Sequence, residues 1–186
     1  MIPNPEFIIY CGPMWSSKTS KLLMELERYR YQKKIIEAFK PKIDDRYDVN
    51  QIVTHGGWGI KATCVTNGSE LLEYVARLEN RPDVIAVDEA FMIPGISKTL
   101  SWLYKSGFSI IVSSLELSAS GKPFDEITNI FPWATRIEKC TAVCTVCSRN
   151  ARFTYKKSVN EDEIEVGGSE LYEPRCFEHH MSFNNR

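Results

Sequence analysis

The sequence predicts an α/β protein, in which a parallel β-sheet has helices on both faces and a small C-terminal lobe follows it. Short apolar runs alternate with amphipathic stretches along most of the chain, which is typical of alternating strands and helices. The expected strands are apolar throughout, as strands buried on both faces of a parallel sheet are. From about residue 135 the strands become shorter and cysteines gather, which indicates a second, smaller unit.

The first half of the chain begins with a buried strand and an amphipathic helix. Leu22, Leu23, Leu26 and Tyr29 recur at the spacing of one helical face, with charged residues elsewhere. The next strand is expected to stop at Pro41, and a polar, glycine-rich stretch then predicts a loop. The expected elements are a strand (6–11), a helix (18–33), a strand (35–39), a loop (42–59) and a strand (60–65).

The second half continues the alternation and then changes character. A helix capped by Ser69 is expected to run to about Glu79, and Gly107 to end a later helix. The remaining expected elements are a strand (83–89), a helix (96–105), a strand (108–112) and a hairpin-like segment (161–168). We therefore expect two units, a sheet domain over residues 1–134 and a small domain over 135–186.

Length and composition restrict the class of protein. A chain of 186 residues is long enough for one compact core with a small appended lobe. The formal net charge of −1 lacks the basic field of a nucleic-acid binder, and no apolar run approaches the roughly 20 residues of a membrane span. The N-terminus lacks the pattern of a signal peptide, so we expect a cytoplasmic location and no membrane partner.

The turn after the first strand carries the strongest local motif. Gly12-Pro13-Met14-Trp15-Ser16-Ser17-Lys18-Thr19 follows the phosphate-loop pattern G-x-x-x-x-G-K-[ST], except that Ser17 replaces the second glycine. In such a loop, backbone N–H groups at a helix N-terminus face the phosphates, the lysine neutralises them and the threonine hydroxyl binds Mg²⁺. The alternative is a strand, turn and helix with a chance match to the pattern.

Two acids at the end of a later strand support the phosphate-loop interpretation. Asp88 and Glu89 follow an apolar run, at the edge of a parallel sheet where ligands bind. An aspartate there is a typical Mg²⁺ partner, and a neighbouring glutamate can accept a proton from an attacking hydroxyl. Two solvated acids at a strand end are the alternative.

The cysteines and histidines of the small lobe have the spacing of a zinc site. Cys144-x-x-Cys147 is followed, after 28 intervening residues, by Cys176-x-x-His179. Two pairs of thiolate and imidazole donors suit a closed, tetrahedral, structural Zn²⁺, with His180 as an alternative fourth ligand. Four unliganded residues are the other reading. His55, the third histidine, is expected to be a hydrogen-bonding loop residue, and the other cysteines to be buried or inert.

These motifs together resemble the type II thymidine kinases. The phosphate loop resembles the family's GPMFSGK[ST], and Lys42-Ile43-Asp44-Asp45-Arg46-Tyr47 its K-x-D-x-R-Y element. Further matches, in order, are Asp88-Glu89-Ala90, Gly121-Lys122-Pro123-Phe124, Lys139 to Cys147, and Gly167-Gly168 with Tyr172 and Cys176. The resemblance implies a P-loop domain with a zinc-bearing lasso lobe, and a homotetrameric enzyme that moves the γ-phosphoryl of ATP to the 5′-hydroxyl of thymidine.

The resemblance also implies roles for individual residues. Glu89 would be the catalytic base, and Arg46 would position or stabilise the phosphoryl group. Phosphates and Mg²⁺ would be held by Gly12, Met14, Ser16, Ser17, Lys18, Thr19 and Asp88. The nucleoside would be held by Met14, Leu115, Phe124, Thr154, Tyr172 and the lasso backbone of Glu163, Ile164, Glu165 and Val166. Zinc would be held by Cys144, Cys147, Cys176 and His179.

Departures from the family pattern lie mostly on the nucleoside side. Phe91 stands where the family has glutamine, Met92 where it has phenylalanine, and Ala119 where it has an aromatic residue. Serine at position 17 would cost on the order of 1 kcal/mol if that position needs a positive φ. The competing interpretations are a weakened relative that acts on a modified pyrimidine nucleoside, a nucleotide- or partner-binding protein, and a zinc-ribbon nucleic-acid binder.

Overall fold

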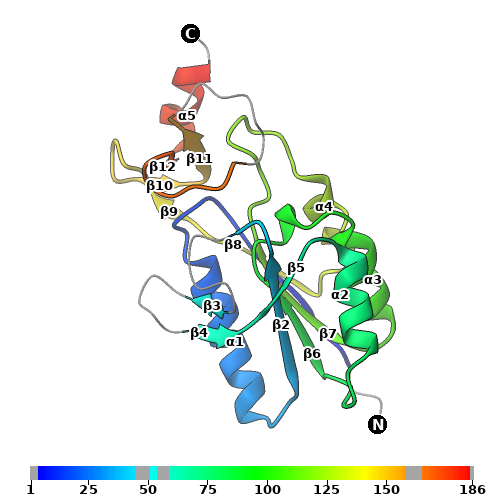
Figure 1. The fold of residues 1–186 in the computed structure, drawn as a ribbon. Helices are drawn as coiled ribbons and strands as arrows, with labels where there is room; N and C mark the ends of the chain where they lie inside the picture. The colour runs from blue at the N-terminus through cyan, green and yellow to red at the C-terminus, as the bar shows by residue number, and fades with distance from the viewer. Residues whose placement is uncertain (1–3, 45–50, 54–58, 158–164, 185–186) are drawn as a thin grey trace.

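A six-stranded, all-parallel sheet forms the centre of the protein in the computed structural model (Figure 1). The structure describes the chain except residues 1–3, 45–50, 54–58, 158–164 and 185–186. In spatial order the sheet contains β5 (Thr63–Val65), β2 (Ile36–Pro41), β6 (Val84–Val87), β7 (Ser109–Ser114), β1 (Phe7–Cys11) and β8 (Arg136–Lys139). The predicted α/β class with a parallel sheet is confirmed.

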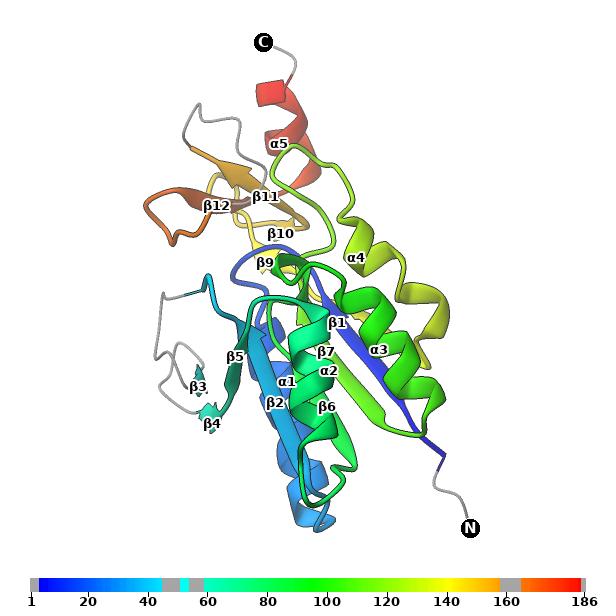
Figure 2. The ribbon, with the colours of Figure 1, turned by 45° about the vertical axis from the view of Figure 1, so that its right-hand side comes forward.

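Helices cover both faces of this sheet, as Figures 1 and 2 show. Alternate residues of β1 enter two separate cores, because successive side chains of a strand point to opposite faces. One core contains the apolar face of α1 (Lys18–Tyr31) and Ile52. The other contains apolar residues of α2 (Gly68–Ala76), α3 (Ile96–Lys105) and the short α4 (Asp125–Thr128). All four residues of β6 are buried, which explains the continuous apolar runs in the sequence.

Several predicted boundaries differ from the structure. The predicted loop 42–59 contains strand β3 (Gln51–Val53), which pairs with β4 (Gly59–Lys61) in a two-stranded antiparallel sheet. The predicted strand 60–65 is therefore two strands, β4 and β5, separated at Ala62. The cap of α2 is Asn67 rather than Ser69, because the Asn67 side chain accepts a hydrogen bond of 2.9 Å from the Glu70 N–H. Gly107 ends α3 with a φ of 88°, as predicted.

The small C-terminal lobe lies beyond the carboxyl ends of the sheet strands (Figures 1 and 2). It contains two short antiparallel pairs, β9 (Ala142–Val143) with β10 (Asn150–Ala151), and β11 (Phe153–Lys156) with β12 (Tyr172–Arg175), followed by α5 (Phe177–Asn184). Because β8 pairs with β1 in the main sheet, the strands of the lobe begin with β9. The predicted division at residue 135 stays a prediction. Of the hairpin-like segment, residues 165–168 are described and have no regular secondary structure.

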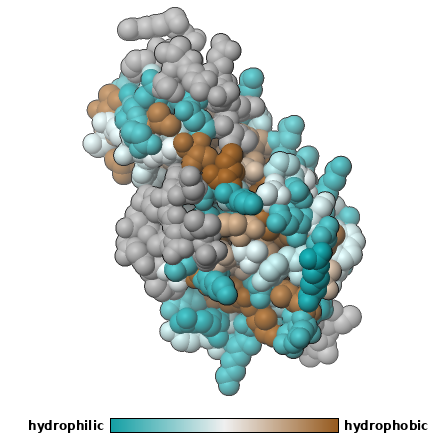
Figure 3. Space-filling model, viewed as in Figure 1, coloured by the Kyte–Doolittle hydropathy of each residue, from teal (hydrophilic) through white to brown (hydrophobic). Residues whose placement is uncertain are grey.

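The described surface is mostly polar on the face that Figure 3 shows, with apolar side chains in a few small groups. Within the described parts of the chain, no helix combines the length and the apolar character that crossing a membrane requires. Two single-turn helices complete the fold, η1 (Ala90–Met92) and η2 (Phe131–Trp133).

A buried carboxylate joins α1 to two strands. Glu25 of α1 accepts a hydrogen bond of 3.0 Å from the Tyr10 hydroxyl of β1 and pairs at 2.5 Å with Arg136 of β8. Arg28, one turn along the helix, pairs with the other oxygen at 3.1 Å. A carboxylate this deeply buried is stable only because several donors surround it.

Removing this carboxylate is expected to destabilise the protein. In Glu25→Ala, the Tyr10 hydroxyl and Arg136 lose their acceptor, and the free energy of unfolding should fall by about 1–3 kcal/mol. Urea denaturation followed by circular dichroism measures this change. Glu27→Ala, two residues away on the same helix with its side chain 37% exposed, is the control and should change stability by less than about 0.5 kcal/mol. Equal stabilities of the two variants would contradict the prediction.

Candidate active site

The phosphate-like loop runs from the end of β1 to the first residue of α1, as the motif requires. Gly12 has a φ of 151°, and a Cβ built on it would lie 2.4 Å from the carbonyl oxygen of Cys140. That oxygen belongs to the backbone that follows β8, so it cannot move aside as the end of a flexible side chain could. Only glycine fits at this position.

Ser17 has the backbone conformation that normally favours glycine. Its φ is 62° and its ψ is 24°, in the left-handed region, and its side chain caps no N–H of α1. The serine that replaces the motif's second glycine therefore costs about 1 kcal/mol relative to glycine. The loop keeps its shape in spite of this cost, since Lys18 begins α1 directly after it.

Lys18 is buried in the loop rather than extended into solvent. Its Nζ donates a hydrogen bond of 2.7 Å to the carbonyl oxygen of Pro13, which also accepts a hydrogen bond of 2.7 Å from the Ser16 hydroxyl. Burial lowers the pKa of Lys18, while the nearby carboxylates of Glu89 and Asp88 raise it. The carbonyl thus holds the ammonium at the loop, where a phosphate oxygen would compete for it.

Asp88 connects three elements at the carboxyl edge of the sheet. It follows β6, and its carboxylate oxygens accept hydrogen bonds of 3.2 and 3.3 Å from the Thr19 hydroxyl of α1. The Ser113 hydroxyl of β7 donates to the same carboxylate. The structure therefore brings the adjacent residues Lys18 and Thr19 together with Asp88, which lies 69 residues after Thr19 in the sequence. Hydroxyl and carboxylate oxygens are the ligands that Mg²⁺ prefers, so this donor set fits the ion.

Burial, and after it the neighbouring carboxylate of Glu89, raise the pKa of Asp88 to about 7, against the hydrogen bonds from Ser113 and Thr19 that lower it. Glu89 itself has a φ of 49°, in the left-handed region. This conformation lets two consecutive acids face different parts of the site, because Asp88 bonds to Thr19 while Glu89 lines a pocket. Strain of this kind is common at functional sites.

A pocket lies beside the loop, between the sheet edge and the small lobe. The space between its lining atoms, about 420 Å³, includes volume that is open to solvent. Most of the lining is apolar, with two acids, Glu89 and Glu165. It is lined by Met14, Glu89, Phe91, Met92, Leu115, Ser118, Ala119, Phe124, Thr154, Glu165, Gly167 and Tyr172.

Two side chains of the small lobe, Thr154 and Tyr172, line the pocket and form hydrogen bonds beside it. The Thr154 hydroxyl of β11 accepts a hydrogen bond of 3.1 Å from the N–H of Met14 in the phosphate loop. The Tyr172 hydroxyl of β12 donates a hydrogen bond of 2.8 Å to the carbonyl of Glu165, whose carboxylate pairs with Lys156 at 2.7 Å. The lobe is therefore attached to the loop and forms one side of the pocket.

The structure brings together most of the residues that the sequence singled out for substrate. Met14, Leu115, Phe124, Thr154, Glu165 and Tyr172 line one pocket, whereas Val166 is half-buried beside it and is not among the lining residues. Arg46, His55, Glu163 and Ile164 lie outside the described residues. Sequence reasoning missed Ser118 as a lining residue, because no motif marks it. The roles in binding and catalysis of the residues that the sequence singled out stay predictions.

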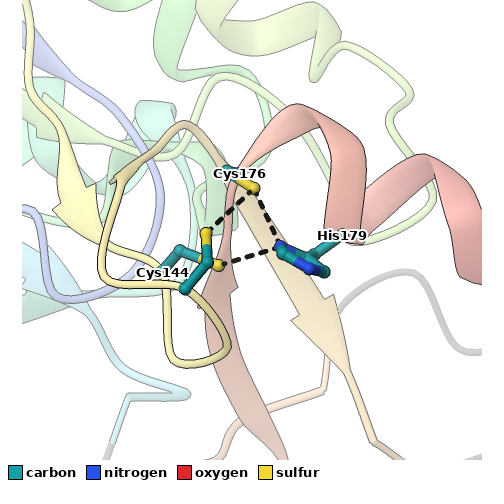
Figure 4. Close-up of side chains that lie close together, drawn as sticks. Cys144, Cys176 and His179 are labelled. Atoms are coloured by element: carbon teal, nitrogen blue, oxygen red, sulfur yellow. Dashed lines mark hydrogen bonds between the residues drawn. The ribbon is translucent and has the colours of Figure 1, made fainter.

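The four predicted zinc ligands form a cluster in the small lobe, and Figure 4 labels three of them, Cys144, Cys176 and His179. The ligand atoms of Cys144, Cys147, Cys176 and His179 all lie within 4.8 Å of one another. The Sγ atoms of Cys147 and Cys176 are 3.7 Å apart, and Nδ1 of His179 lies 3.1 Å from the Cys176 Sγ and 3.7 Å from the Cys144 Sγ. Cys144 and Cys147 come from the turn that follows β9, Cys176 lies between β12 and α5, and His179 lies in the first turn of α5.

These distances fit a tetrahedral zinc ion. With Zn–S bonds of about 2.3 Å, two sulfurs at tetrahedral angles lie about 3.8 Å apart, close to the observed separation. Burial raises the pKa of the Cys144 thiol, but backbone N–H groups of Cys176, Val146 and Cys147 lower it to about 6, so the thiolate is favoured. His179 completes the cluster, and the alternative ligand His180 points elsewhere, to the carbonyl of Ala119.

We expect about one zinc per chain in the purified protein. Cys176→Ser should lose it, because a closed site with three ligands binds the ion much more weakly. Mass spectrometry of the metal content measures this. Cys64→Ser is the matched control, since Cys64 is half-buried in β5 outside the cluster, and it should keep the zinc. Zinc-free folded wild type, or zinc retained in Cys176→Ser, would contradict the assignment.

The raised pKa of Asp88 predicts that this group lowers the free energy of unfolding by an amount that depends on pH. A carboxyl that titrates near 7 in the folded state and at 3.8 in the unfolded state makes the folded protein bind more protons between these pH values. Its contribution to stability therefore falls as pH rises from 4 to 7. In Asp88→Asn this cost disappears, and the free energy of unfolding at pH 8 should be about 2–4 kcal/mol higher than in wild type.

Urea denaturation at pH 8 and at pH 5 measures the stability difference between Asp88→Asn and wild type, and the stability gain of the variant should be smaller at pH 5. Asp83→Asn is a control of opposite sign, because the N–H of Ile35 holds the pKa of Asp83 below its usual value. That variant should be less stable than wild type at pH 8. An Asp88→Asn variant less stable than wild type at pH 8 would refute the argument.

A comparison of the whole sequence with protein-family models identifies the family of this chain. The model of the thymidine kinase family, described as "Thymidine kinase", matches residues 6–180. The match spans the phosphate loop, the acid pair, the pocket residues and the metal cluster. The geometry of the site and this match agree, and the chain belongs to the thymidine kinase family.

Proposed function

We propose that this protein is a thymidine kinase, which transfers the γ-phosphoryl group of ATP to the 5′-hydroxyl of thymidine. Family membership supports a nucleoside kinase, a phosphotransferase. The observation that carries the proposal is the pair of consecutive acids after β6. Asp88 bonds to Thr19 at the phosphate loop, while Glu89 lines the neighbouring pocket, so one turn of chain joins a phosphate site to a nucleoside site.

The phosphate end of the site suits a nucleotide triphosphate. The N-terminus of α1 and the N–H groups of the loop bind phosphate oxygens, and Lys18 supplies the charge that phosphoryl transfer needs. Thr19 and Asp88 would hold Mg²⁺, which when bound neutralises charge on the phosphates. With the magnesium carboxylate in its charged form above pH 7, we expect metal binding to weaken as pH falls below that value.

The nucleoside end suits a small apolar ring with a reacting hydroxyl. The base would lie among Met14, Leu115 and Phe124, and the 5′-hydroxyl would face Glu89. Glu89 accepts the hydroxyl proton as the oxygen forms a bond to the γ-phosphorus. The bond from that phosphorus to the β–γ bridging oxygen breaks, and ADP leaves with the electron pair.

The remaining roles rest on the family resemblance. Arg46 would stabilise the transferring phosphoryl group, and Tyr172 with the backbone of Glu163, Ile164, Glu165 and Val166 would cover the nucleoside and exclude water. Zinc would hold the lobe together and take no part in the reaction, because its four protein ligands leave no open position. A homotetramer, a cytoplasmic location and domains at 1–134 and 135–186 complete the proposal.

A nucleoside panel with ATP and Mg²⁺ tests the reaction. The panel contains thymidine, the other deoxynucleosides and pyrimidine deoxynucleosides with larger 5-substituents, because Ala119 and Phe91 line the pocket. We expect thymidine 5′-monophosphate and ADP in equal amounts, measured by chromatography. Glu89→Gln should lower kcat by about 10²- to 10⁴-fold, since it removes the proton acceptor with little change of shape.

Glu79→Gln is the matched control, since Glu79 is an exposed acid outside the site, and it should have wild-type rates. If no nucleoside in the panel is phosphorylated, the kinase proposal is wrong. If product forms equally fast in Glu89→Gln, the base is another group. Preference for a larger 5-substituted nucleoside would replace thymidine as the substrate and keep the reaction.

A further inference from the structure

The second histidine of the small lobe is buried against the active-site domain. His180 lies in α5, directly after the metal-cluster residue His179, and is only 1% exposed. Its ring stacks on Phe153 of β11, with ring centroids 4.7 Å apart and an angle of 21° between the planes. The stacking fixes the plane of the imidazole, and therefore the direction in which its nitrogens point.

One nitrogen of this ring bonds to a wall of the pocket. Nε2 of His180 lies 2.9 Å from the carbonyl oxygen of Ala119. A carbonyl oxygen only accepts hydrogen bonds, so Nε2 carries the proton and donates. Nδ1 is buried and has no hydrogen-bond partner among the residues that the structure describes. The geometry therefore specifies one tautomer and one contact for this side chain.

The segment that receives this bond is a closed loop, Leu115–Phe124, called the pocket loop here. It supplies four of the residues that line the pocket: Leu115, Ser118, Ala119 and Phe124. Its tip closes on itself, because the N–H of Ser118 donates to the Lys122 carbonyl at 2.8 Å and the N–H of Gly121 to the Ser118 carbonyl at 2.9 Å. Within the described chain, the bond from His180 is the hydrogen bond that fixes the tip of the loop, residues 118–121, to another element.

The small lobe thus touches opposite parts of the pocket. Thr154 bonds to Met14 in the phosphate loop, and His180 bonds to Ala119 in the pocket loop. Both Thr154 and the stacking partner of His180 belong to β11, whereas His180 itself belongs to the helix that carries His179. The position of the pocket loop is therefore connected to the metal cluster through one turn of helix.

We propose that His180 is a positioning residue, which fixes the Ala119 side of the pocket and so makes nucleoside binding depend on the zinc lobe. This inference rests on the proposed function, since it assigns the pocket to a nucleoside. A zinc ion bound by His179 would hold the first turn of α5, and the neighbouring His180 would hold the pocket loop in its binding shape. Among the described residues, no hydrogen bond or ring contact joins His180 to Lys18, so the ATP side of the site should be unaffected.

Substitutions of His180 that keep or lose a donor nitrogen at the position of Nε2 test its role as a positioning residue. The side-chain amide nitrogen of glutamine extends as far as Nε2 of histidine, whereas that of asparagine extends only as far as Nδ1. We therefore expect His180→Ala and His180→Asn to raise KM for thymidine about 3- to 10-fold, the size of one lost hydrogen bond. KM for ATP and kcat should change less than twofold, and His180→Gln should restore KM for thymidine to near the wild-type value.

Two further measurements separate positioning from general damage. All variants should contain about one zinc per chain, and amide hydrogen exchange of residues 118–122 should be faster in His180→Asn than in His180→Gln or wild type. Arg152→Ala, an exposed position in the same lobe, is the control and should match wild type in every measurement.

The outcomes also separate this inference from the proposed function. Wild type that phosphorylates thymidine, with the same KM in His180→Asn, would overturn the inference and leave the kinase proposal intact. Wild type without kinase activity would overturn the kinase proposal, and the hydrogen-exchange comparison would still decide whether His180 holds the pocket loop. Equal zinc loss in the glutamine and asparagine variants, with equal loss of both substrates, would show a structural role only and overturn the inference.

Discussion

The buried carboxyl group of Asp88 is the point on which the arrangement of the site depends. Its bonds to Thr19 and Ser113 connect the helix after the phosphate loop to two central strands of the sheet. The same burial that raises its pKa to about 7 makes the group costly to the folded protein when it is charged. A protein optimised for stability alone would avoid such a group, whereas a divalent cation on the phosphates would favour its charged form.

Backbone strain is concentrated around the same site. Gly12, Ser17 and Glu89 all have positive φ values, and all lie where the chain leaves a strand or enters a helix next to the pocket. The positive φ values of the two non-glycine residues, Ser17 and Glu89, cost free energy that the surrounding sheet must offset. In return, the consecutive side chains of Asp88 and Glu89 face different partners, so that the phosphate-like loop and the pocket share one short edge of the sheet.

The small lobe is too small for a core of its own, and its described buried cluster consists of Ala142, Ala151 and two of the metal-cluster cysteines. A metal ion can replace the missing apolar core in a unit of this size. The lobe is attached to the main domain by contacts at the pocket, notably Thr154 with Met14 and His180 with Ala119. The cluster of predicted metal ligands and the shape of the pocket are for this reason parts of one assembly.

The sequence by itself determined the parallel sheet, the phosphate loop and the metal cluster, because each is a local signal: an apolar run, a turn before a helix, or donors at fixed spacing. It did not determine the cap at Asn67, because Asn67 and Ser69 are both typical cap residues. It did not determine strand β3, which lies in a polar stretch and pairs with β4, or the lining residue Ser118, which only folding brings beside the other pocket residues. Only the tertiary structure decided that His179 rather than His180 joins the cluster. The spacing allows either histidine, but α5 directs one imidazole to the cysteines and the next to the pocket loop.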